Sequence, residues 1–156
     1  MKLNGLINIM LINLVRKFKN FTVQNNFGAY LISVTYNCYK KFVLGEKNFK
    51  IFKSQKYWIH QTSVGLLAYN RPIFNPEEYV KENYEIFFEY YLPKTNDVVI
   101  ELGSGVGNET IYISSLIGKQ GKVIAVEPFK EIFDLLRKTI EINNVKNVLM
   151  VNKAYI

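Results

Sequence analysis

Short apolar runs alternate with helix-periodic segments in the carboxyl-terminal half of the chain. Apolar runs at 98–102, 122–126 and 148–152 are flanked by turns rich in glycine or asparagine. Between them, 107–117 and 129–143 carry apolar residues at helical spacing. This order predicts three parallel strands joined by two helices, and right-handed crossovers place the strands in the spatial order 3-2-1. The expected fold class is α/β, with an incomplete doubly wound, Rossmann-like parallel sheet.

A further helix is predicted just before the first strand. Asn75 provides an N-cap, Pro76 suits the first helical position, and Glu78 completes a capping-box pattern. An aromatic stripe continues to Tyr91, and Pro93 ends the pattern. The segment 76–91 is therefore expected to be helical and to open the cofactor-binding domain.

The first 75 residues carry weaker patterns, which predict a mostly helical extension. The segment 3–15 is apolar with asparagine interruptions, and a membrane-spanning helix would need about 20 residues. It is interpreted as an amphipathic helix that packs on its own domain or a second subunit, or lies on a membrane surface. A second helix is expected at 27–43, whereas 48–68 alternates in part and suits a strand or an irregular lid. Two domains are thus expected, at 1–75 and 76–156.

Charge is distributed unevenly along the chain. Residues 1–56 contain ten Lys and Arg but one acid, whereas the remainder is slightly acidic. The cofactor-binding domain is therefore no basic platform, and no nucleic acid partner is expected. A single cysteine excludes an internal disulfide, and no Cys/His cluster indicates a metal site. These features favour a cytoplasmic protein, with peripheral membrane or subunit contact through 1–45 as an open alternative.

The chemistry-bearing motif follows the first predicted strand. Glu101 ends an apolar run and is followed by a G-x-G-x-G turn, and Glu127 stands at the end of the next strand. A dinucleotide fingerprint would have its third glycine where this chain has Asn108. No Gly-Lys-Ser/Thr follows the turn either, which argues against a Walker A loop. Two carboxylates beside the turn favour a positively charged nucleoside cofactor, and S-adenosylmethionine carries an ammonium and a sulfonium.

Each residue around the turn has an expected role. Glycines let the backbone approach the ligand, Glu101 faces the amino-acid end, and Glu127 accepts hydrogen bonds from the ribose hydroxyls. Asn108 either caps the following helix or touches the cofactor, and Phe129 is interpreted as a packing residue rather than an adenine platform. The expected cofactor-binding residues are Glu101, Gly103, Ser104, Gly105, Gly107, Asn108, Glu127, Pro128 and Phe129.

Four stretches carry a family resemblance: VVIELGSGVGNET, GKVIAVEP, LLRKTIEINNV and NVLMVNKA, all within about 97–154. They resemble the opening of a class I S-adenosylmethionine-dependent methyltransferase and, more narrowly, the FkbM family of O-methyltransferases. That family often reads D-x-G-A-x-x-G where this chain has Glu101-Leu-Gly-Ser-Gly-Val-Gly. The resemblance implies methyl transfer to a hydroxyl of a sugar or another small molecule.

Three strands form the first half of a doubly wound sheet, so the chain is expected to be a fragment or a truncated product. The missing half of such an enzyme normally supplies the acceptor pocket, and no catalytic residue is assigned. His60, the only histidine, is interpreted as a packed residue. The alternative function is a truncated, non-catalytic module for cofactor binding or interaction.

Overall fold

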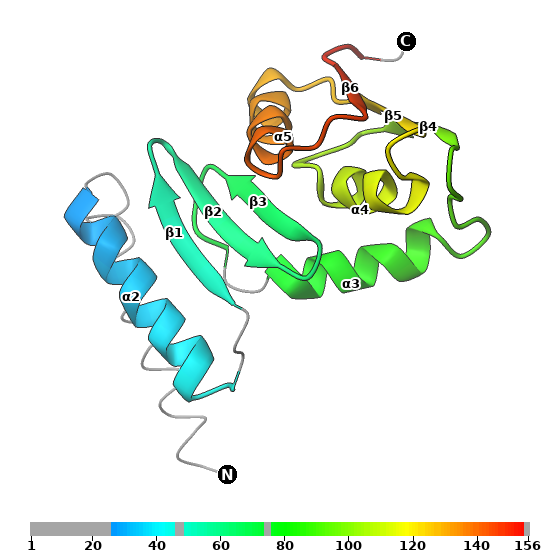
Figure 1. Cartoon of the computed structure of the whole chain (residues 1–156). Coiled ribbons are helices and arrows are strands. Elements are labelled where there is room, and N and C mark those ends of the chain that lie inside the picture. Colours follow the sequence, from blue (N-terminus) through cyan, green and yellow to red (C-terminus); the bar gives the residue numbers. More distant parts are fainter. Residues whose placement is uncertain (1–25, 46–48, 74–75, 155–156) are drawn as a thin grey trace.

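The computed structural model describes residues 26–45, 49–73 and 76–154. The helix predicted over 3–15 and the N-cap predicted at Asn75 lie outside the described residues. Two sheets of three strands each form the framework, and Figure 1 shows them beside one another. In chain order the elements are α2 (Asn26–Phe42), β1 (Lys50–Ser54), β2 (Tyr57–Thr62), β3 (Gly65–Tyr69), α3 (Pro76–Phe87), β4 (Val98–Leu102), α4 (Asn108–Ile117), β5 (Lys122–Val126), α5 (Lys130–Ile142) and β6 (Val148–Val151).

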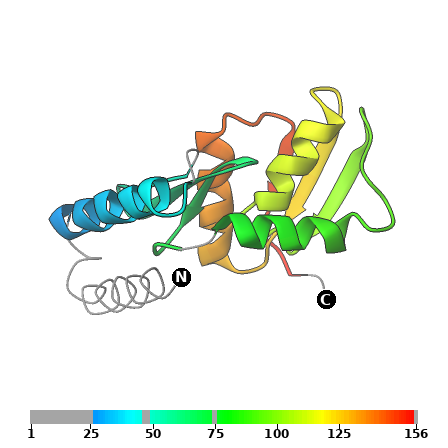
Figure 2. The same ribbon diagram turned by 90° about the horizontal axis from the view of Figure 1, so that it is seen from below.

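The carboxyl-terminal sheet has the order β4-β5-β6, and both strand pairs are parallel. Helices α4 and α5 pack on one face of it, as right-handed crossovers between successive neighbouring strands require. Figure 2 shows both helices on the same side of the strands. The predicted parallel sheet is therefore present, and its description as half of a doubly wound sheet stays a prediction.

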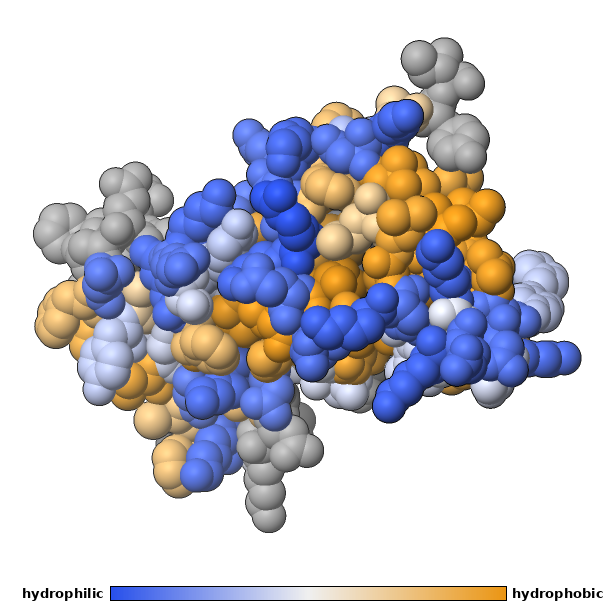
Figure 3. Space-filling model, turned by 45° about the horizontal axis from the view of Figure 1, so that its top comes forward, coloured by the Kyte–Doolittle hydropathy of each residue, from blue (hydrophilic) through white to orange (hydrophobic). Residues whose placement is uncertain are grey.

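The opposite face of β4 is open to solvent. Val98, Ile100 and Leu102 alternate along the strand and are 67%, 60% and 59% exposed. Their neighbour Val99 points the other way and packs against the core. Figure 3 shows apolar surface gathered over this part of the molecule. Apolar side chains on an uncovered sheet face are unusual, because strands of parallel sheets are normally buried on both faces.

Helix α3 is shorter than its sequence pattern predicts. It begins at Pro76 as expected but ends at Phe87, before Tyr91. The Tyr91 hydroxyl and the Lys94 backbone N–H both donate to Asp97 Oδ2, at 2.6 and 2.8 Å. These bonds hold 91–97 as a connection that leads into β4. The aromatic stripe seen in the sequence therefore extends beyond the end of the helix.

The amino-terminal part is less helical than predicted. Helix α2 confirms the helix expected at 27–43, but 50–69 forms the antiparallel sheet β1-β2-β3 rather than more helix. The strand alternative for 48–68 is thus the one the structure adopts. Helix α2 covers this sheet with Ile32 and Tyr36 against Ile51 and Trp58. Asn37 fixes the register, since its amide accepts from and donates to the Ile51 backbone at 2.8 and 2.9 Å.

Strand β3 joins the two sheets. The Leu66 backbone exchanges two hydrogen bonds with the Asn143 amide, at 2.9 and 2.6 Å. The Ala68 N–H donates to Thr139 Oγ1 at 2.9 Å, where the threonine side chain is fully buried. The parts on either side of the predicted domain boundary at residue 75 are therefore in direct contact. The boundary itself stays a prediction.

Candidate functional site

The turn between β4 and α4 has left-handed backbone at three glycines. The φ angles of Gly103, Gly105 and Gly107 are 78°, 55° and 94°, a region that favours glycine. The Gly103 and Ser104 N–H groups donate to the Val126 carbonyl at 2.8 and 3.0 Å. These bonds hold the turn over the carboxyl end of β5.

The three glycines have different surroundings. A Cβ atom added at Gly103 or Gly105 would meet no atom within 4 Å, so the turn faces open space there. At Gly107 the same atom would lie 2.7 Å from Leu136 Cδ1. Gly107 is therefore required by helix packing, whereas Gly103 and Gly105 leave room for a ligand next to the backbone.

Glu127 connects the turn to the start of α5. Its side chain is only 5% exposed; Oε2 accepts from the Gly105 N–H and Oε1 from the Phe129 N–H, each at 3.0 Å. A carboxylate has about four lone-pair sites, so both oxygens keep capacity for a further donor. Asn152 holds the backbone of this segment by donating to the Glu127 carbonyl at 2.7 Å. The sequence-based expectation did not include Asn152.

Glu101 sits beneath the turn. Thr110 Oγ1 donates to its Oε2 at 2.6 Å. Burial raises the pKa of Glu101 to about 7, and the Glu109 carboxylate adds to this rise, although the bond from Thr110 opposes it. A cation placed beside Glu101 would favour its ionised form. Neither Thr110 nor Glu109 was predicted, although both directly follow the glycine turn in the sequence.

Ser104 is buried inside the turn rather than directed at open space. Its hydroxyl lies 3.3 Å from the Glu101 carbonyl and 3.4 Å from the Val126 carbonyl, so it bridges the ends of β4 and β5. The side chain of Ser104 therefore supports the shape of the turn. Only the backbone of this residue continues the path of the neighbouring glycines.

Asn108 does not cap α4, which corrects one of its two expected roles. The N-cap is Gly107, and Asn108 is the first helical residue, with its amide donating to Glu109 Oε1 at 2.7 Å. Tyr84 of α3 approaches the Asn108 carbonyl at 3.5 Å and stacks on Tyr112, with ring centroids 4.2 Å apart. Burial and the Glu109 carboxylate both raise the pKa of Tyr84. These contacts place α3 across the start of α4.

Phe129 is not a packing residue, contrary to its sequence interpretation. Its side chain is 71% exposed, and Pro128 beside it is exposed as well. Phe129 is the N-cap of α5 with extended backbone, which carries the ring out of the helix. An exposed aromatic ring therefore stands at the carboxyl end of β5, two residues from the Glu127 carboxylate.

His60 is fully buried in the small sheet. Its Nε2 accepts from the Ile73 N–H at 3.3 Å, and its ring meets Tyr69 edge-on at 5.0 Å between centroids. Burial lowers its pKa to about 4, so the ring is neutral at neutral pH. This agrees with the packing interpretation. Across the described residues, no group of three or more His, Cys, Asp or Glu side chains could hold a metal ion. No described helix is long and apolar enough to cross a membrane.

Comparison with known proteins gives a family match over most of the chain. The model of the protein-L-isoaspartate(D-aspartate) O-methyltransferase family matches residues 52–153. This range covers β2 to β6 and the whole glycine turn. The FkbM family named by the sequence resemblance is not the family that matches, so that narrower expectation is not confirmed.

Individual relatives are similar over shorter parts. A Sulfurisphaera tokodaii protein named "Probable cobalt-precorrin-6B C(15)-methyltransferase (decarboxylating)" is 35% identical over 52 residues, covering 33% of this chain and 27% of that protein. The solved structure "Crystal structure of M. jannaschii TYW2 in complex with AdoMet" is 21% identical with a TM-score of 0.52, covering 67% of this chain and 46% of that one. The chain thus spans less than half the length of either relative, and the structural likeness shows a shared α/β fold.

Proposed function

Because the chain belongs to the protein-L-isoaspartate(D-aspartate) O-methyltransferase family, we propose that it acts as an S-adenosylmethionine-dependent methyltransferase. The cofactor lies along the turn between β4 and α4 in this proposal. The observation that carries it is the open space in front of Gly103 and Gly105, bordered by the Glu127 carboxylate. Ligands of open α/β sheets bind at the carboxyl ends of the strands, where this turn stands.

The residues present fit this cofactor. Two Glu127 oxygens with spare lone pairs suit the two ribose hydroxyls, and the exposed Phe129 ring suits the flat adenine. Glu101 suits the ammonium of the amino-acid end, because a cation nearby offsets the desolvation that raises the pKa of this carboxyl. Gly103, Ser104, Gly105, Gly107 and Asn108 supply the backbone path between these groups.

The bound cofactor would supply an electrophilic methyl group on a positively charged sulfur. The chain's own residues would bind and orient it, and the acceptor oxygen must lie in line with the carbon–sulfur bond that breaks. A hydroxyl acceptor also loses a proton to a base, whereas a carboxylate acceptor does not. No described residue is assigned as that base.

We propose oxygen as the methyl-accepting atom, because the description of the family names O-methyl transfer. The hydroxyl of a sugar or another small molecule, expected from the FkbM resemblance, gains no support from the family match. Activity on a protein carboxylate is the acceptor class that the family description favours, and it is the first to test.

A second candidate function is cofactor binding without transfer. The observation in its favour is the exposed apolar face of β4, where Val98, Ile100 and Leu102 have no covering layer. An acceptor pocket needs walls that exclude water, and this side of the described sheet offers none. Binding and transfer must therefore be measured separately.

Calorimetric titration with S-adenosylhomocysteine tests the cofactor site. Glu127→Ala should weaken binding about 10-fold or more, since hydrogen bonds to a carboxylate contribute about 1.5–3 kcal/mol each. Glu127→Gln keeps the side-chain shape and should also bind weakly, which separates lost charge from a collapsed turn. Glu131→Ala, an exposed carboxylate in the first turn of α5, is the matched control and should bind as wild type.

Unchanged affinity in both Glu127 variants would remove this residue from the site. Absence of binding by the wild-type chain would contradict the proposed function. Binding without transfer of a labelled methyl group to an isoaspartyl peptide would favour the second candidate.

A further inference from the structure

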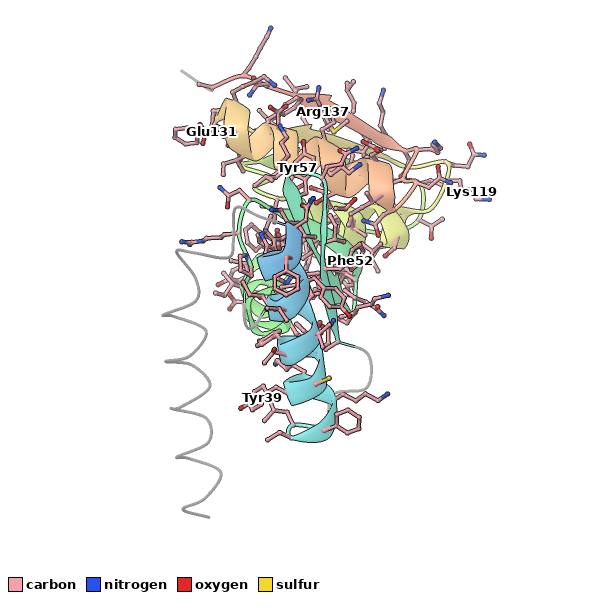
Figure 4. All side chains as sticks on the ribbon, turned by 90° about the vertical axis from the view of Figure 1, so that its left-hand side faces the viewer. Tyr39, Phe52, Tyr57, Lys119, Glu131 and Arg137 are labelled. Carbon is pink, nitrogen blue, oxygen red and sulfur yellow. The ribbon has the colours of Figure 1, made fainter. Side chains whose placement is uncertain are left out.

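Two aromatic rings lie on one face of the small sheet. Phe52 pairs with Ile59 across β1 and β2, and Tyr57 pairs with Ser54, so the two rings are diagonal neighbours on the same face. Both side chains are half-buried. Figure 4 labels Phe52 and Tyr57 on this sheet, with Arg137 of α5 beyond Tyr57.

Lysine side chains surround these rings. Lys50 Nζ lies 5.4 Å from the centre of the Phe52 ring, and Lys56 Nζ lies 5.2 Å from the centre of the Tyr57 ring. Lys138 of α5 approaches the same tyrosine, with its Nζ 5.9 Å from the ring centre. We call this surface the Lys–aromatic face, formed by Lys50, Phe52, Lys56, Tyr57 and Lys138.

Basic residues outnumber acids around this face. Residues 26–73 include seven Lys and Arg and one acid, Glu46. Lys138 is paired with Glu141 at 2.7 Å, but the glutamate side chain is 66% exposed. A phosphate bound here would replace the Glu141 carboxylate as the partner of Lys138, whose own side chain is 17% exposed. Asp134 of α5 also lies near this face, since its pKa is lowered by the bond from Lys130 and by the charge of Lys56. The face therefore attracts polyanions through an excess of lysines over acids.

We propose that the Lys–aromatic face binds single-stranded nucleic acid. Phosphates pair with the ammonium groups, and unpaired bases stack on the half-buried Phe52 and Tyr57 rings beside the part of the sheet that α5 covers. The flat rings distinguish this partner from a simple polyanion, which needs only the lysines. The sequence-based expectation excluded nucleic acid because the basic surplus belongs to the amino-terminal arm and not to the cofactor-binding domain. The structure adds Lys138 of α5 to the Lys–aromatic face, although this residue lies in the predicted cofactor-binding domain.

This inference does not depend on the proposed function. None of the five residues belongs to the glycine turn, and the side chains of Glu101 and Glu127 bond to Thr110, Gly105 and Phe129 instead. Loss of cofactor binding would leave it intact, and loss of nucleic acid binding would leave the cofactor site intact.

The test is fluorescence anisotropy of the full chain with labelled oligouridine of about 15 nucleotides. At about 50 mM salt we expect a dissociation constant in the micromolar range, because low-specificity binding usually lies between about 1 and 100 µM. The logarithmic salt slope should be about −2, since three lysines each contribute about −0.7 on single strands. The double variant Lys50→Gln/Lys56→Gln should bind roughly 10-fold more weakly and lose more than half of the slope.

Tyr57→Leu tests the stacking. It should lower the affinity for RNA roughly 5-fold to 100-fold and leave binding to heparin unchanged. Tyr57→Phe keeps the ring and should bind RNA as wild type. Lys119→Gln and Tyr90→Leu are controls, because both side chains are exposed and lie outside the Lys–aromatic face. Neither variant should change the affinity for RNA. Thermal melts of every variant identify any that fail to fold.

Three results would overturn the proposal. The first is no RNA binding up to roughly 100 µM protein at low salt. The second is equal loss of RNA and heparin binding in the lysine variant with no effect of Tyr57→Leu, which indicates a general polyanion surface. The third is tighter binding to vesicles of phosphatidylglycerol than to RNA, which indicates a lipid surface.

Discussion

The two sheets of this molecule carry opposite charge. The small-sheet unit (26–73) has seven Lys and Arg and one acid, whereas the parallel-sheet unit (76–154) has nine Lys and Arg and twelve Asp and Glu. Three of those acids, Glu101, Glu109 and Glu127, gather around the glycine turn. A unit that presents carboxylates suits a cationic cofactor, and a unit with a strong excess of lysine suits a polyanion. The charge balance of the whole chain, +7, hides this division.

The same two units differ in how they bury apolar surface. The small-sheet unit packs α2 on its sheet through a five-residue cluster, whereas the parallel-sheet unit has a larger one. Leu67 of β3 belongs to the larger cluster. The boundary between the basic and acidic units is therefore not a boundary between two separate cores. Strand β3 belongs to the basic unit by sequence, but its Leu67 packs in the core of the acidic unit.

The largest expected effect concerns the packing of the glycine turn. Gly107→Ala should destabilise the protein by about 2–5 kcal/mol, because the new Cβ would lie 2.7 Å from Leu136 Cδ1 at a positive φ. Gly105→Ala has a positive φ but no atom within 4 Å, so it should cost about 1–2 kcal/mol. Thermal unfolding measures both. Equal losses in the two variants would contradict the distinction between a packing glycine and a ligand-facing glycine.

A smaller effect is expected where the two units join. Thr139→Val keeps the shape of the side chain but leaves the buried Ala68 N–H without its acceptor, at a cost of about 1–3 kcal/mol. Hydrogen exchange at Ala68 should accelerate in step with the lost stability. Ser115→Ala, which removes an exposed hydroxyl from α4, is the control and should change little. Unaltered exchange at Ala68 would mean that β3 and α5 are not joined through this bond.

The smallest effect depends on pH and concerns the acidic character of the turn. The folded-state pKa of Glu101, about 7, lies above its usual 4.5, so the folded protein binds more protons than the unfolded chain between these values. Stability should therefore fall as pH rises through this window. Glu101→Gln removes the ionisation and keeps a hydrogen-bonding side chain, so it should be more stable than wild type by about 1–2 kcal/mol at pH 8 and equal to it near pH 4.

Chemical unfolding at both pH values measures this difference. Glu131→Gln, an exposed carboxylate of α5, should show no such pH dependence. A constant gap between Glu101→Gln and wild type across the range would show that the carboxyl of Glu101 is not desolvated.

Sequence patterns predicted the parallel-sheet unit well and the small-sheet unit poorly. Strands β4 and β5 have the predicted bounds, because a short apolar run between glycine-containing turns has few alternatives. The segment 48–68 mixes lysine with aromatic residues and alternates only in part, so strand and lid were not distinguishable. Helix α3 ends at Phe87, and the bonds that Tyr91 and Lys94 make to Asp97 after it depend on chain folding rather than on helical periodicity.

The sequence predicted the glycine turn of the candidate site and its Glu127 carboxylate. It did not predict the side chains that support them. The glycines and Glu127 follow from local rules, since a turn with positive φ needs glycine and a carboxylate at the strand end is visible in the chain. Thr110, Glu109 and Asn152 have no such signal, because their roles depend on the partner each one meets. The exposure of Phe129 also depends on where the end of β5 lies relative to α5.

The amino-acid sequence by itself determined the strand–helix order, the glycine turn and the basic composition of the small-sheet unit. These properties depend on residues close together in the chain, where side-chain period and backbone freedom decide the outcome. Only the tertiary structure decided which distant side chains meet. Asn143 reaches Leu66 across 77 positions, and Lys138 reaches Tyr57 from helix α5. Such contacts depend on how the helices pack against the sheets, which local patterns do not contain.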